Sequence, residues 1–108
     1  MNWQKDARTI ATLLQNAGYE VQVSDVISAW RAAGAVREIF IDQSGQLRCV
    51  ETRAPGAPRG KSVARANRKY RVLVEDRCIT TITTQLKSAE DLSAVLRDID
   101  AILKKGNA

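Results

Sequence analysis

The chain has 108 residues, of which 44% are hydrophobic and 27% charged, and its formal net charge is +5. This composition is typical of a single globular domain, and the apolar runs are too short for a transmembrane helix, so no membrane partner is expected. The sequence has no histidine, which removes the commonest general base and transition-metal ligand, so we expect no catalytic site, metal or other cofactor.

The first predicted element is a helix. Apolar residues recur at helical spacing over residues 3–17, and Gly18 can end such a helix in the left-handed conformation. The alternating run at residues 19–23 is too short to predict a strand on its own. Residues 25–34 then predict a second helix, capped by a polar residue at its start, with Trp30 and its apolar neighbours in the core.

Four strands in two hairpins are predicted next. The first hairpin joins residues 36–42 to residues 46–53, and the second joins residues 70–76 to residues 78–86. A last helix over residues 88–105 begins with acids and ends with lysines, which is the arrangement that the helix dipole favours.

The order of these elements is α-α-β-β-β-β-α. We therefore expect one domain of the α+β class, a two-layer sandwich in which a four-stranded antiparallel sheet of two hairpins carries helices on one face. Strand alternation predicts one set of side chains under the helices, namely Ile39, Ile41, Val72, Val74 and Ile82. It predicts a second set on the open face, namely Phe40, Arg71, Thr81, Thr83 and Gln85.

Two cysteines, Cys49 and Cys78, lie in predicted strands. Two cysteines without histidine do not supply the four ligands of a structural zinc site. We expect free thiols in a reducing compartment, in agreement with the cytoplasmic location that the charged N-terminal segment indicates. A disulfide between two strands is the alternative.

The positive charge is concentrated in one stretch. Between Arg48 and Arg71 there are eight basic residues and one acid, a charge of +7, which leaves +5 − 7 = −2 for the rest of the chain. Most of this charge falls in a flexible loop at about residues 54–69, the basic loop, which is longer than two neighbouring hairpins need. Residues 56–62 differ from a nucleotide-binding phosphate loop, because one residue is missing between the glycines and Pro58 removes a backbone donor.

Arginine and lysine at this density favour contact with phosphodiester groups, because each such contact releases counterions. We therefore predict a small nucleic-acid-binding module that uses the basic loop to bind a DNA or RNA backbone with weak sequence preference. Tyr70, beside the loop, would offer a stacking surface, as would Phe40. The predicted binding residues are Arg59, Lys61, Arg65, Arg68, Lys69, Arg71 and Tyr70.

The alternative is a protein-interaction module without a nucleic-acid role, either a homodimer or an adaptor. An antiparallel sheet with one uncovered face can associate with a second copy, and Thr81 and Thr83 would support such pairing by sheet extension. The basic loop would then bind an acidic protein surface.

Overall fold

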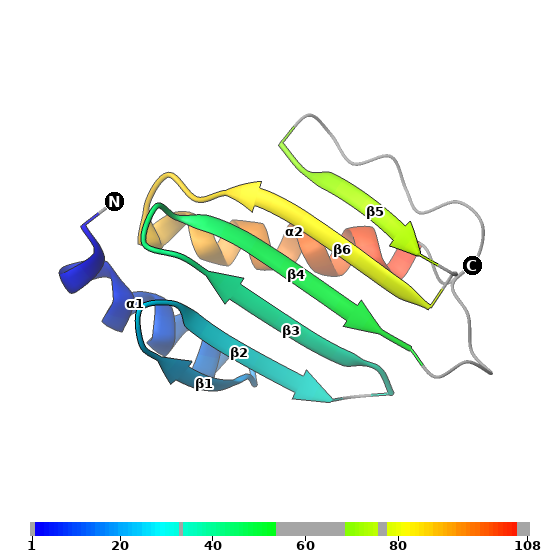
Figure 1. The fold of residues 1–108 in the computed structure, drawn as a ribbon, viewed down its shortest axis with the longest axis horizontal. Coiled ribbons are helices and arrows are strands. Elements are labelled where there is room, and N and C mark those ends of the chain that lie inside the picture. The colour runs from blue at the N-terminus through cyan, green and yellow to red at the C-terminus, as the bar shows by residue number, and fades with distance from the viewer. Residues whose placement is uncertain (1, 33, 54–68, 76–77, 106–108) are drawn as a thin grey trace.

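The computed structural model describes residues 2–32, 34–53, 69–75 and 78–105. The strands of this part form a six-stranded antiparallel sheet in the order β1-β2-β3-β4-β6-β5 (Figure 1). Neither described helix is long and apolar enough to cross a membrane. In chain order the elements are α1 (Trp3–Asn16), β1 (Glu20–Val23), β2 (Ile27–Ala32), β3 (Val36–Ile41), β4 (Gln46–Thr52), β5 (Arg71–Glu75), β6 (Ile79–Gln85), the 3-10 turn η1 (Ala89–Asp91) and α2 (Leu92–Lys105).

The hydrophobic core lies between the sheet and the two helices. Ile10 and Leu14 of α1 and Val95 and Ile99 of α2 are fully buried in one cluster with the inward side chains of the strands. These residues meet the sheet because apolar side chains at helical spacing gather on one side of each helix. Figure 1 shows both helices behind the sheet. The opposite face carries no helix among the described residues, and we call it the open face.

The predicted α+β class and antiparallel sheet are confirmed, whereas the predicted four-stranded sheet in the order α-α-β-β-β-β-α is wrong. Residues 27–32 form the strand β2 in place of the predicted helix, and β1 adds a further strand. Along β2, Ile27 and Ala29 are buried while Trp30 is exposed, which is the period of a strand. An apolar run this short is compatible with the period of a helix and with that of a strand. The segment forms a strand because β1 pairs with it on one side and β3 on the other.

The connection between β1 and β2 shows why the sequence was ambiguous at this point. The backbone N–H of Ser24 and its hydroxyl both donate to the carbonyl of Val26, at 3.1 and 3.2 Å. The sequence predicts that a polar residue at this point caps a helix. Short polar side chains satisfy backbone groups in turns as well as at helix starts, so this signal does not separate the two structures.

The predicted assignment of side chains to the two faces of the sheet is confirmed. Ile39, Ile41 and Ile82 are fully buried under the helices, and Val72 and Val74 of β5 are half-buried. The pairing register places the other predicted set on the open face, namely Phe40, Arg71, Thr81, Thr83 and Gln85.

The position of β6 between β4 and β5 explains part of the length of the connection from β4 to β5. Thr52 at the end of β4 pairs with Ile79, and Arg71 at the start of β5 pairs with Thr83. The chain must therefore return about 13 Å along the sheet and cross two strand spacings of about 5 Å each. Both predicted hairpins are present as antiparallel pairs, β3 with β4 and β5 with β6, and they are neighbours in the sheet through β4 and β6. A separation of this size needs only about five extended residues, so it accounts for a small part of the connection.

Candidate nucleic-acid interface on the open face

Four strands place one row of side chains across the open face. Phe40 of β3 lies opposite Arg48 of β4, Arg48 lies opposite Thr83 of β6, and Thr83 lies opposite Arg71 of β5. We call these four residues the open-face row. Both arginines are exposed, and Phe40 and Thr83 are half-buried. The row therefore brings two cations and an aromatic ring to one surface, although they are far apart in the chain.

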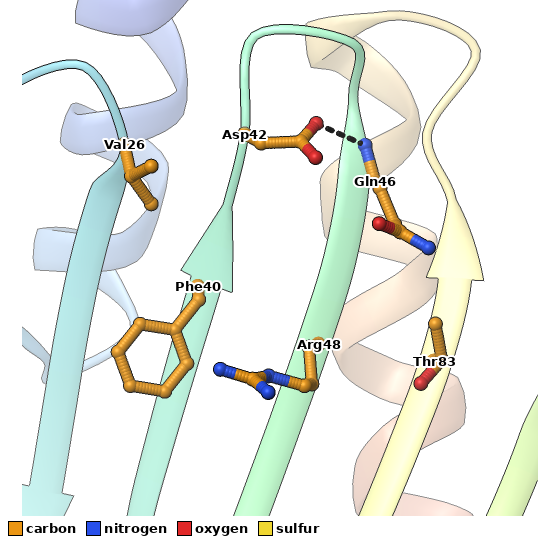
Figure 2. A pocket seen from close by; sticks show the side chains of 6 residues that line it. All are labelled: Val26, Phe40, Asp42, Gln46, Arg48 and Thr83. Atoms are coloured by element: carbon orange, nitrogen blue, oxygen red, sulfur yellow. Dashed lines mark hydrogen bonds between the residues drawn. The ribbon is translucent and has the colours of Figure 1, made fainter.

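Phe40 and Arg48 interact directly. The Arg48 guanidinium carbon lies 5.1 Å from the centre of the Phe40 ring, which is within the range of a cation–π interaction. Figure 2 shows the guanidinium beside the ring, in a shallow pocket. This pocket has a volume of about 310 Å³ and is lined by Val26, Phe40, Asp42, Gln46, Arg48 and Thr83.

Asp42 at the rim of this pocket is engaged in the turn between β3 and β4. Its Oδ1 accepts hydrogen bonds from the Ser44 hydroxyl at 2.6 Å, the Ser44 N–H at 2.9 Å and the Gln46 N–H at 3.0 Å (Figure 2 shows the last). The bond from the Ser44 hydroxyl, more than the backbone bonds, holds the pKa of Asp42 below its ordinary value. The carboxylate thus stabilises the turn that joins the strands of Phe40 and Arg48.

Trp30 is an exposed aromatic residue that the sequence analysis placed in the core. It lies on the open face between Glu20 and Glu38, its partners on the neighbouring strands, and is 47% exposed. The two acids make its surroundings unfavourable for phosphate, in contrast to those of Arg48. The missed signal was the alternation of residues 27–30, since a strand that buries positions 27 and 29 turns position 30 outward.

Tyr70 lies on the helix side, away from the open-face row. It is 5% exposed, and its hydroxyl donates a hydrogen bond of 2.5 Å to Oδ2 of Asp98 on α2. Burial, with the nearby Asp98 carboxylate, raises the pKa of Tyr70 above its ordinary value. The buried ring contributes to the contact between the start of β5 and α2, rather than presenting a face to solvent for stacking.

Lys69 also faces this part of the molecule. Its Nζ lies 3.4 Å from Oδ1 of Asp91 and 5.8 Å from the centre of the Tyr70 ring, and its carbonyl accepts a hydrogen bond of 2.8 Å from the Thr84 hydroxyl. Arg71, the third described member of the predicted binding set, points to the opposite face of the sheet. The other four predicted residues, Arg59, Lys61, Arg65 and Arg68, lie outside the described residues.

A second cluster of charged residues lies between the sheet and α2. Arg37 of β3 contacts Oδ1 of Asp100 at 2.5 Å and Oε2 of Glu51 at 3.2 Å, and Arg53 contacts Oε1 of Glu51 at 3.2 Å. The Tyr19 hydroxyl lies 3.4 Å from Nη1 of Arg37. Arg31 of β2 also lies 3.8 Å from Oδ1 of Asp100, so each of the two acids lies between two arginines. The cluster links β2, β3 and β4 to α2, which fits a structural role.

Both cysteines are free thiols. Cys49 is fully buried opposite Ile82, and burial raises its pKa to about 12. Cys78 lies at the far end of β6, where its carbonyl accepts a hydrogen bond from the N–H of Arg53. A disulfide between the two strands, the alternative from the sequence, is therefore absent.

The described residues contain no group of three or more His, Cys, Asp or Glu side chains placed to hold a metal ion. Comparison of the chain with protein-family models, with curated proteins and with solved structures finds no match.

Proposed function

We propose that the protein binds nucleic acid through the sugar-phosphate backbone, with weak sequence preference, on the open face of the sheet. The observation that carries the proposal is the open-face row, in which two exposed arginines from separate strands share a surface with Phe40. Arg71 is two residues beyond the basic loop in the sequence, so the row and the loop would supply one positive region.

The spacing of the two arginines suits a polyanion. Arg48 and Arg71 are two strands apart, which separates their Cα atoms by about 10 Å. Two long side chains at this spacing can reach different phosphates of one strand, and a guanidinium can bind each phosphate through two parallel hydrogen bonds. Each contact would release a counterion, so affinity would depend on salt concentration.

Phe40 gives the row a preference for single strands. Its ring is half-buried beside Arg48, at a shallow pocket on the open face. An unpaired base can stack on such a ring with its neighbouring guanidinium, whereas the bases of a duplex are already stacked on one another. Stacking tolerates any base, which agrees with weak sequence preference.

The test is fluorescence anisotropy with labelled single-stranded DNA, single-stranded RNA and duplex DNA, at several salt concentrations. We expect the Arg48→Ala/Arg71→Ala variant to bind more weakly, and its log–log salt slope for single strands to be smaller by about 1.4, because two phosphate contacts are lost. We expect Phe40→Leu to weaken binding of single strands by about 1–3 kcal/mol, with little change in the salt slope.

The matched control is Arg8→Ala/Arg97→Ala, which removes the same net charge from exposed positions on the two helices. We expect this variant to keep most of the affinity. Equal losses in the two double variants would contradict a site on the open face and indicate attraction to net charge alone. Absence of binding at low salt would contradict the proposal as a whole.

A further inference from the structure

The outer edge of β5 is unpaired among the described residues. β5 pairs with β6 on one side and is the last strand of the sheet in that direction. Leu73 at its centre is 55% exposed, and Val72 and Val74 are only half-buried. Its sequence, RVLVE, contains neither proline nor lysine, which are residues that commonly protect an edge strand from pairing. Such an edge is suited to receive another strand.

The sequence of β5 is complementary to itself. In an antiparallel pair of two β5 strands with a two-fold axis at Leu73, each Arg71 lies opposite Glu75 of the other copy. Leu73 then lies opposite Leu73, and Val72 lies opposite Val74. All four charged side chains find opposite partners on the open face, and the valines meet on the helix side.

Other pairings of the edges lack this complementarity. A parallel pair of β5 strands in register would place Arg71 beside Arg71 and Glu75 beside Glu75, which is destabilising. A shift of the antiparallel axis by one residue would place each arginine opposite Leu73, or each glutamate opposite it. The sheet's other edge strand, β1, has the sequence EVQV and contains no cation to pair with Glu20.

We propose that the protein forms a symmetric dimer in which β5 pairs with β5 of a second copy, in antiparallel orientation with Leu73 opposite Leu73. The two sheets then continue into one another, and both open faces lie on the same side. The pairing uses one short strand from each copy, so the dimer is a weak one, in reversible exchange with the monomer. It requires no nucleic acid.

Analytical ultracentrifugation of the full chain without nucleic acid tests this dimer. Glu75→Arg and Arg71→Glu each replace two attractive contacts by two repulsive ones, and we expect each to weaken dimerisation by roughly ten- to thirtyfold. The double variant Arg71→Glu/Glu75→Arg restores opposite charges, and we expect its dissociation constant to return to within about threefold of the parent value. Glu20→Arg at the other edge of the sheet is the control, and should leave dimerisation unchanged.

A monomer at every concentration up to about 1 mM would overturn the proposal. A dimer that the single reversals do not weaken, or that the double reversal does not restore, would show that another surface associates and would also overturn it. Failure of the dimer proposal can be distinguished from failure of the nucleic-acid proposal. Glu75→Arg should weaken the dimer, but it adds positive charge beside the open-face row and should not weaken nucleic-acid binding.

Disulfide trapping tests the register. In a Cys78→Ser background, we expect Leu73→Cys to form a covalent dimer under mild oxidation, because directly opposite Cβ atoms lie about 4.5–5.5 Å apart. Val23→Cys, an equally exposed position at the β1 edge, should remain monomeric. Equal or faster trapping at position 23 would overturn the proposed pairing.

Discussion

The contact between Tyr70 and Asp98 provides a direct test of the role of Tyr70. Tyr70→Phe keeps the buried ring and removes only the hydroxyl that donates to Asp98 at 2.5 Å. A hydrogen bond to a charged group contributes about 1.5–3 kcal/mol, and Asp98 is half-buried, so water can replace part of the bond. We therefore expect a decrease of about 1–2 kcal/mol in the free energy of unfolding, measured by urea denaturation at pH 7.

A double-mutant cycle separates this bond from other effects of the substitution. If the hydroxyl acts through Asp98, Tyr70→Phe should cost about 1 kcal/mol less in an Asp98→Ala background than in the parent. We also expect Tyr70→Phe to leave the affinity for single-stranded nucleic acid unchanged, since the ring lies on the helix side. A variant with unchanged stability and weakened nucleic-acid binding would refute this reasoning and return Tyr70 to the binding set.

Three further predictions concern buried groups. Because burial raises the pKa of Cys49 from 9.0 to about 12, its contribution to stability is complete below pH 9 and is lost as the pH rises toward 12. Urea unfolding should show a fall of about 1.4 kcal/mol per pH unit in that window relative to Cys49→Ala, and parallel curves would contradict it. In a thiol-reagent assay of the native protein, half-buried Cys78 should react first and Cys49 only after unfolding; simultaneous reaction would contradict the burial. Among the described residues, the buried Thr80 hydroxyl lacks a hydrogen-bond partner, so Thr80→Val should raise the free energy of unfolding by about 1 kcal/mol; a decrease would show that the hydroxyl is satisfied.

Local sequence patterns predicted an element correctly where they were compatible with only one kind of secondary structure. The apolar stripe of the last helix, with acids at its start, predicts α2 because no strand would bury those residues together. The hairpin between β3 and β4 was predicted from Gly45, which has a φ of +89° in the turn, a conformation that glycine adopts without strain. Alternation along these strands also gave the correct faces.

Local signals were insufficient where the decision depends on partners distant in the chain. β2 is a strand because β1 and β3 supply hydrogen bonds on both sides, which a ten-residue window does not contain. The position of β6 between β4 and β5 is one of several possible strand orders. Each order would bury the same alternating residues, so the alternation does not predict which order forms. The sequence could therefore predict both strands of the last hairpin without predicting which one is the edge.

Part of the candidate site could be predicted from the alternation of side chains between the two faces of each strand. If Val72 and Val74 face the helices, then Tyr70 faces them too, while Arg71 faces outward. The same argument turns Arg48 outward, between buried Leu47 and Cys49. The binding set that charge density predicts instead includes Lys69 and Tyr70 and omits Arg48.

Charge density along the chain also overestimates the charge available to a ligand. Of the four described basic residues between Arg48 and Arg71, Arg53 pairs with Glu51 and Lys69 pairs with Asp91, which leaves Arg48 and Arg71 exposed on the open face. With the four basic residues of positions 59–68, at most six cations of this stretch in the monomer can then neutralise phosphates, because the proposed dimer pairs Arg71 with Glu75 of the second copy. Six contacts on a single strand correspond to a log–log salt slope of about −4. A slope much steeper than this would require phosphate contacts from cations on the helix side. The size of the slope therefore tests which cations are paired within the fold and which are available to phosphate.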